Sequence, residues 1–189
     1  MLVAGIGPAL PPAVCCPFCA GELGPWGRRG YPRFVRARGE TSVLRVRRAV
    51  CRHCRVTHAL LPSFLCPRRR DLVEAIGAAL VGAAAGRGYR PLAALLGVPE
   101  TTVRDWLRRV RQRAVVLRAC FLRLAGAFGV EAPRPPPTAE PLAWLVAAVA
   151  DAHAAARARL GEGAVAGGLW AFASAACGGA LVAYTDPPW

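Results

Sequence analysis

Between residues 89 and 113, apolar side chains recur at helical spacing, pause at a glycine, and then recur again. We therefore predict two helices joined by a tight turn, because positions i, i+3, i+4 and i+7 share one helix face. Gly97 suits the turn since glycine adopts a positive φ without strain, and Pro99 pre-sets φ for the second helix. The apolar positions are Leu92, Ala93, Leu95 and Leu96 in the first helix and Val103, Trp106, Leu107 and Val110 in the second.

The polar residues of the second predicted helix fall on its other faces. They are Thr101, Thr102, Arg104, Asp105, Arg108, Arg111 and Gln112. Two helices around a glycine turn, the second with an outward polar face, have the layout of a helix-turn-helix, whose second helix lies in the DNA major groove. The competing interpretation is an ordinary corner between two helices with a solvated charged face. No Ser, Thr, Asp or Asn precedes the second helix, so Pro99 or Glu100 must begin it without a side-chain cap.

A further helix is predicted before this pair. Asp71 and Glu74 are spaced as in a capping box, and the helix is expected to run to about Ala85. Its expected inward side chains are Leu72, Ile76, Leu80 and Val81. The three helices would form a trihelical domain, and apolar residues from Val115 to Leu124 would extend the last helix and could serve as a dimer surface.

Upstream of these helices, apolar and polar residues alternate instead of recurring at helical spacing. Residues 31–38 and 42–50 are strand-like and are joined by a turn at residues 38–41. In the second strand Leu44, Val46 and Val50 alternate with Arg45 and Arg47, which is the period of a half-buried strand. This segment therefore predicts a β-hairpin.

The C-terminal third begins with a proline-rich stretch at residues 131–141, which we interpret as an exposed linker. A helix then carries Leu142, Leu145, Val146, Val149 and His153 on one face, and a second, alanine-rich helix ends at Gly178 and Gly179. The uncharged run at residues 163–184 is long enough to span a bilayer. Its many glycines and few large apolar side chains favour a small helical module over a membrane helix.

Two C-x-x-C pairs flank the predicted hairpin. Cys16 and Cys19 form the first pair and Cys51 and Cys54 the second, with 31 residues between the pairs. Two such pairs can complete a tetrahedral Zn²⁺ site, and four thiolates leave no position for a catalytic water. The segment is thus predicted to be a structural zinc ribbon. Alternatives at single positions are Cys15 in place of Cys16 and His58 as a substitute ligand, and the cysteines could also be incidental.

Charge is distributed unevenly along the chain. The formal net charge is +14, and residues 1–70 hold 13 arginines and 2 acids, whereas residues 119–189 hold 4 arginines and 5 acids. A basic field around a helix-turn-helix is the electrostatic footprint of a nucleic-acid-binding protein. Arginines of the hairpin, including Arg45 and Arg47, are expected to contact phosphates, which position a protein on DNA but carry no sequence information.

The cysteine pairs followed by GYRPLAALLGVPETTVRDWLRR resemble the N-terminal DNA-binding part of insertion-sequence transposases, and short actinobacterial proteins of unknown function with the same layout. The resemblance covers residues 14–118. It implies that Cys16, Cys19, Cys51 and Cys54 are zinc ligands and that Glu100 to Arg111 form the recognition helix. Transposase catalysis needs convergent carboxylates that hold two metal ions. The 71 residues after residue 118 contain five acids and are too few for a ribonuclease-H-like fold, so only DNA binding is carried over.

These observations predict a mainly α protein with a small β zinc ribbon. The expected parts are a flexible leader at 1–13, the zinc ribbon at 14–67, the helix-turn-helix domain at 68–128, a linker at 129–141 and a C-terminal helical module at 142–189.

The expected function is that of a non-enzymatic, sequence-specific regulator of transcription or transposition that binds double-stranded DNA in the cytoplasm, at the nucleoid. A homodimer is compatible with this function; a small-molecule substrate and a membrane are not expected. One alternative is an interaction module that docks on a transposase or on the transcription machinery. A shortened, catalytically active transposase is another.

Overall fold

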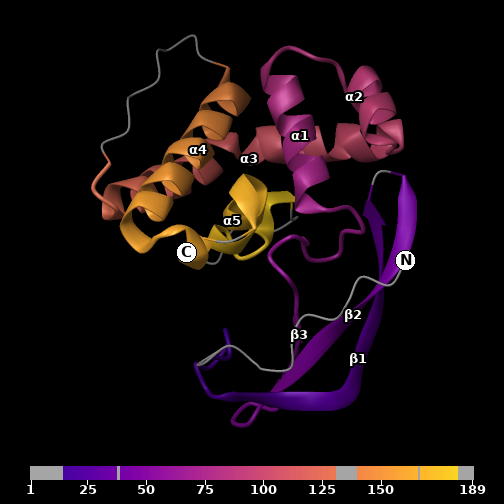
Figure 1. Ribbon diagram of the computed structural model, residues 1–189, viewed down its shortest axis with the longest axis vertical. Coiled ribbons are helices and arrows are strands. Elements are labelled where there is room, and N and C mark those ends of the chain that lie inside the picture. Colours follow the sequence, from indigo (N-terminus) through magenta and orange to yellow (C-terminus); the bar gives the residue numbers. More distant parts are fainter. Residues whose placement is uncertain (1–14, 38, 131–139, 166, 183–189) are drawn as a thin grey trace. The chain divides into compact units, whose positions relative to one another are not determined.

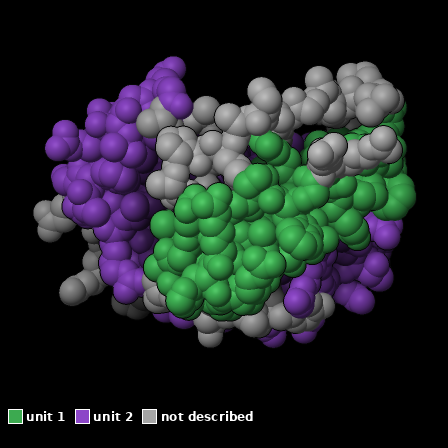
Figure 2. Space-filling model, turned by 90° about the horizontal axis from the view of Figure 1, so that it is seen from below, with its two compact units in different colours: residues 1–62 green, residues 63–189 purple. Residues whose placement is uncertain are grey.

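The computed structural model describes residues 15–37, 39–130, 140–165 and 167–182. The chain forms two compact units, residues 1–62 and residues 63–189, which are coloured separately in Figure 2. The mainly helical fold with a small antiparallel sheet is confirmed. The predicted leader and most of the predicted linker lie outside the described residues.

The first unit is a three-stranded antiparallel sheet in the order β1-β2-β3 (Figure 1). Its strands are β1 (Leu23–Ala37), β2 (Glu40–Cys51) and β3 (Thr57–Leu60). The predicted hairpin is confirmed, but β1 begins earlier than expected and β3 was not predicted. Pairing of β1 with β2 runs from Leu23 opposite Cys51 to Ala37 opposite Glu40. It is irregular between Trp26 and Tyr31, where Gly27 and Gly30 have φ of 75° and 67°.

The predicted alternation along β2 holds only for its distal half. Leu44 and Val46 are buried, and Arg45 between them is exposed. Nearer the cysteines the buried positions are Ala49 and Cys51, so the expectation that Val50 points inward was wrong. The reason is that the cysteine loops pack on the opposite face of β2 at this end. There Ala49 and Cys51 join Cys16 and Leu23 in a small core.

The second unit packs its helices around one hydrophobic core. They are α1 (Val73–Ala84), α2 (Tyr89–Leu96), α3 (Glu100–Ala127), α4 (Pro141–Leu160) and α5 (Gly168–Ala176), with short 3-10 turns η1 (Glu162–Val165) and η2 (Ala180–Val182). Figure 1 shows α3 lying behind α1 and α4. None of the helices in the described part of the chain combines the length and apolarity needed to cross a bilayer.

Each of the first two helices differs from its prediction at one exposed apolar position. Val81 of α1 is 45% exposed and Leu95 of α2 is 69% exposed, although both were expected among the apolar contacts. α1 begins at Val73, one residue later than the predicted capping box implies. Leu72 is the N-cap and makes no side-chain cap hydrogen bond, and Asp71 before it is buried.

The turn between α2 and α3 forms as predicted. Gly97 ends α2 with φ 62° and ψ 35°, the left-handed conformation that glycine adopts most readily. Val98 is buried, and Pro99 is the N-cap of α3, with no side-chain cap among the described residues. The four apolar positions predicted for the second helix are all buried: Val103, Trp106, Leu107 and Val110.

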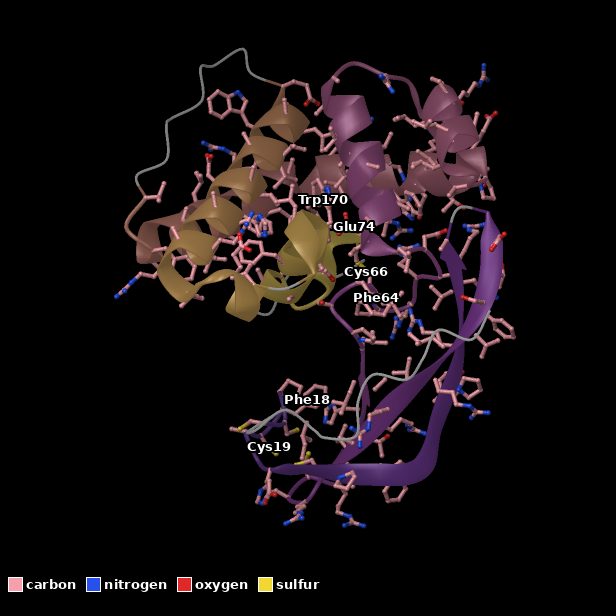
Figure 3. All side chains as sticks on the ribbon, viewed as in Figure 1. Phe18, Cys19, Phe64, Cys66, Glu74 and Trp170 are labelled. Atoms are coloured by element: carbon pink, nitrogen blue, oxygen red, sulfur yellow. The ribbon has the colours of Figure 1, made fainter. Side chains whose placement is uncertain are left out.

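α3 continues for 28 residues and joins the N-terminal helices to the C-terminal ones. Its first half packs with α1 and α2, and its second half contributes Leu117 and Phe121 to a core shared with Leu142 and Leu145 of α4. The C-terminal helices expected to form a module of their own are therefore part of the same core as α1–α3. Trp170 of α5, labelled in Figure 3, packs on α1 at Gly77.

Gly77 provides a test of this packing. A Cβ atom at Gly77 would lie 2.1 Å from the Trp170 ring. We expect Gly77→Ala to lower the free energy of unfolding by about 1–3 kcal/mol, the typical cost of overpacking. Urea unfolding followed by helical circular dichroism measures it. The matched control is Gly126→Ala in α3, where a Cβ would have no atom of the described residues within 4 Å. Because alanine favours helix, this variant should unfold at equal or higher urea. Equal stability of the two variants would contradict the packing.

Candidate metal centre and helical surface

Four cysteines converge at one end of the sheet. Cys16 and Cys19 precede β1, Cys51 ends β2 and Cys54 follows it, and their sulfur atoms all lie within 4.8 Å of one another. The Cys16 and Cys54 sulfurs are 3.6 Å apart, and those of Cys19 and Cys51 are 3.5 Å apart. Four sulfurs at about 2.3 Å from a tetrahedral Zn²⁺ would be about 3.8 Å from one another. The cluster therefore fits a thiophilic ion of this size. Figure 3 shows it where Cys19 is labelled.

The two cysteine loops have the same backbone geometry. The N–H of Ala20 donates to the carbonyl of Cys16 at 2.8 Å, and the N–H of Arg55 donates to that of Cys51 at 3.1 Å. Ala20 and Arg55 both have positive φ, 55° and 63°. Each loop closes with a second bond from the N–H of its first cysteine, Cys16 to Gly21 and Cys51 to Val56. The loops are thus two copies of one knuckle that direct their sulfurs to a common point.

Local geometry separates the two adjacent cysteines of the first knuckle. Cys16 is buried within the cluster, whereas Cys15 is exposed and lies outside it. Gly21 lies against the sulfurs, because a Cβ there would be 3.1 Å from the Cys51 sulfur and 2.9 Å from the Cβ of His53. The choice of Cys16 over Cys15 as a cluster member is therefore confirmed by the structure.

His58 of β3 lies beside the cluster. Its Nε2 is 3.4 Å from the Cys16 sulfur, and its ring faces that of Phe18 at a centroid distance of 5.8 Å. The four cysteines complete a tetrahedral set without it, so the geometry favours His58 as a neighbour that donates to a thiolate over His58 as a substitute ligand. The pairing of Ala49 with His58 brings it there, a contact that sequence spacing alone did not indicate.

The cluster perturbs the acidity of its thiols in opposite directions. A hydrogen bond from the backbone N–H of Cys54, 3.4 Å from the sulfur, is the largest cause that lowers the pKa of Cys51 to about 6. The backbone N–H of Val56 lowers the pKa of Cys54, but burial and the neighbouring thiols outweigh it and raise that pKa to about 12. A thiolate at Cys51 therefore sits beside a protonated thiol. A bound cation would permit both to ionise.

Six of the eight residues predicted to contact DNA belong to α3. Thr101, Arg104, Arg108 and Arg111 are exposed, whereas Thr102 and Asp105 are half-buried. The exposed four recur at i, i+3, i+7 and i+10, so they form one stripe, which we call the outer stripe of α3. In the first unit, Arg45 is exposed and Arg47 is half-buried.

Asp105 is engaged in a cluster of arginines. Its carboxylate accepts from Arg109 at 2.7 Å and from Arg108 at 3.0 Å, and pairs with Arg69 at 3.6 Å. The hydrogen bond from Arg109 is the first of the causes that lower the pKa of Asp105. Arg109, only 6% exposed, was missed by sequence analysis although its i, i+4 spacing from Asp105 indicates such a pair.

Comparison with known protein families gives one match. A domain of unknown function (DUF6431) matches residues 16–110. The chain belongs to this family. The DUF6431 match begins at the first cysteine of the cluster and ends at the last of the four predicted apolar positions of α3. It thus includes the sheet, α1, α2 and the outer stripe except Arg111. Searches of curated proteins and of solved structures found no match.

Metal binding can be tested through the adjacent cysteines. We expect the purified protein to bind one Zn²⁺ or Co²⁺ per chain, with the absorption of a four-thiolate site in the Co²⁺ form. Cys16→Ser should lose this absorption and unfold the sheet, because metal binding contributes about 10–16 kcal/mol in small zinc domains. Cys15→Ser, at the exposed neighbour, should bind as the wild type does. Retained four-thiolate absorption in Cys16→Ser would contradict the assignment.

The acidity of Cys54 predicts how metal binding depends on pH. A thiol with a pKa of about 12 is protonated at neutral pH, so metal binding must displace at least its proton. Zinc affinity should therefore rise by about tenfold per pH unit for each proton displaced, and fall on acidification. Competition with a chelator between pH 6 and pH 8, corrected for protonation of the chelator, measures the slope. A pH-independent affinity would show that the thiols are already ionised.

Proposed function

We propose that this DUF6431 protein is a non-enzymatic, sequence-specific binder of duplex DNA in which α2, its turn and α3 act as a helix-turn-helix. The observation that carries the proposal is the outer stripe of α3. Three exposed arginines, Arg104, Arg108 and Arg111, lie on the face of α3 opposite its buried apolar residues. An arginine in the major groove can donate two hydrogen bonds to guanine, for about 1–3 kcal/mol of discrimination per pair.

The geometry around the stripe supports this role. The left-handed Gly97 and the buried Val98 fix a short turn between α2 and α3. Arg90 of α2 and Glu100 of α3 form an exposed ion pair at 3.6 Å, which adds little stability. The fixed turn matters because a side chain can contact a particular base only when the helix backbone holds its Cα atom in a defined position.

Asp105 takes a different role from the one predicted for it. Its oxygens already accept from Arg108 and Arg109, so we assign it to holding Arg108 in place and not to contacting a base. The buried Arg109 and the nearby Arg69 anchor the same carboxylate to the body of the second unit. Arg108 would then meet DNA with fewer accessible rotamers than Arg104, which would favour a defined hydrogen-bonding geometry.

The first unit would serve as a zinc-dependent basic support. Residues 1–62 contain ten arginines and two acids, a charge balance that attracts phosphates. Zn²⁺ at the four cysteines would supply folding energy, and its filled coordination shell would leave no site for substrate or water. The resemblance to the DNA-binding part of transposases supports a role in controlling transcription or transposition.

The proposal is tested by selecting bound duplexes from a random DNA library at near-physiological salt. The zinc-loaded wild type should enrich a discrete motif, and Arg104→Ala/Arg108→Ala should lose the base pairs of that motif that α3 reads. The matched control is Arg87→Ala/Arg159→Ala, which removes two exposed positive charges that do not belong to α3. It should keep the motif. Arg45→Ala should weaken binding to all sequences alike. It should also make the slope of the logarithm of affinity against the logarithm of salt concentration less steep by about one.

Three outcomes of this selection separate the alternatives. Loss of the motif in both double variants would assign binding to net charge alone. Equal losses on selected and random DNA for Arg104→Ala/Arg108→Ala would remove α3 from base recognition. Absence of any motif for the wild type would favour an interaction module that docks on another protein.

A further inference from the structure

The distal part of the β1–β2 hairpin has two unlike faces. We define the arm as residues 31–37 of β1 and 40–46 of β2. One face carries Val35, Leu44 and Val46, all at most 6% exposed. Residues directly opposite each other in an antiparallel pair lie on the same face. The other, outer face is therefore formed by the pairs Pro32–Arg45, Phe34–Val43 and Arg36–Thr41.

At the centre of the outer face lies an exposed apolar pair. Phe34 is 55% exposed and Val43, directly across from it, is 43% exposed. Pro32, next along the same face, is exposed as well. An exposed cluster of apolar side chains within a charged surface is typical of an interaction site.

The surroundings of this pair indicate a polyanionic partner. Arg45 is exposed on one side of Phe34 and Val43, and Arg36 is half-buried on the other. Between the ends of the arm the only acid in the sequence is Glu40, at its tip. Apolar groups flanked by arginines complement a ligand that presents apolar groups between phosphates.

Duplex DNA fits this surface better than a single strand does. Proteins that bind single strands stack successive bases on successive aromatic rings, whereas the outer face offers one ring, a valine and a proline. In the major groove, by contrast, each thymine exposes a methyl group that apolar side chains contact. Paired strands lie about 4.8 Å apart, and the groove, about 12 Å wide, admits a two-stranded β-ribbon.

We propose that the arm enters the major groove and recognises thymine methyl groups through Phe34 and Val43, while Arg36 and Arg45 hold the flanking phosphates. This inference rests on the proposed function in one respect, that the protein binds duplex DNA. The inference goes beyond the proposed function because it assigns sequence recognition to the zinc-dependent unit as well as to α3. The selected motif should then have two parts, one read by each unit.

The test repeats the random-duplex selection with Phe34→Ala in the zinc-loaded full chain. The part of the motif that contains T·A pairs should be lost in Phe34→Ala and kept in Arg104→Ala/Arg108→Ala. The matched control is Phe18→Ala, which removes a phenylalanine that is 75% exposed on the first cysteine knuckle, outside the arm. It should select the same motif as the wild type.

A second measurement changes the DNA instead of the protein. Uracil replaces each selected thymine in turn, which removes only the methyl group. Wild-type affinity should fall by about fourfold for each contacted thymine, the worth of one buried methyl group. Phe34→Ala and Val43→Ala should be less sensitive to the replacement, and Phe18→Ala as sensitive as the wild type. The wild-type measurement remains decisive even if a variant fails to fold.

The outcomes separate the two proposals. Recognition by the arm is overturned, and recognition by α3 is left standing, by either of two results. One is an unchanged motif in Phe34→Ala, and the other is a wild-type affinity that does not change when uracil replaces thymine. A motif that is lost in Phe34→Ala but fully kept in Arg104→Ala/Arg108→Ala overturns recognition by α3 and leaves recognition by the arm standing. Absence of any motif for the wild type overturns both.

Discussion

The cysteine cluster is the contact on which the first unit depends. Within the described part of this unit, the hydrophobic core around the cluster consists of four buried residues, and two of them, Cys16 and Cys51, belong to the cluster itself. So small a core cannot offset the conformational entropy of ordering a long hairpin. The cluster also joins the start of β1 to the end of β2, which fixes the hairpin register at its base. The position of every side chain on the arm follows from that register, because a slip of one residue exchanges the two faces.

The second unit is held differently, by apolar burial around one long helix. The first half of α3 buries Trp106 and its second half buries Phe121, both in the core that α1, α2 and α4 share. Two glycines of α1 allow side chains of other helices to approach its backbone closely. Gly77 admits Trp170, and Gly82 admits Leu92, whose side chain would lie 2.4 Å from an added Cβ. A unit built in this way needs no metal to bury its core, so loss of metal should affect the first unit selectively.

Local patterns predicted much of this structure, and the misses share a physical cause. The two C-x-x-C pairs, the glycine turn and the apolar face of α3 each follow from residues close together in sequence. The capping box misplaced the start of α1 by one residue, because Leu72 stays extended and pairs with Leu65 in an isolated antiparallel bridge. β3 was missed because four residues show no clear period, and its place depends on pairing with β2. The C-terminal helices were expected to stand apart because a proline-rich stretch precedes them, yet composition does not show where a helix face will pack.

The continuity of α3 makes it a rigid rod. At a rise of 1.5 Å per residue, the 17 steps from Arg104 to Phe121 span about 26 Å. Phe121 lies in the core shared with α4, while Arg104 lies in the exposed stripe. A small change in how α4 packs would tilt the rod at one end and displace the arginines at the other. The packing of the C-terminal helices can thus set the orientation of a surface at the far end of α3.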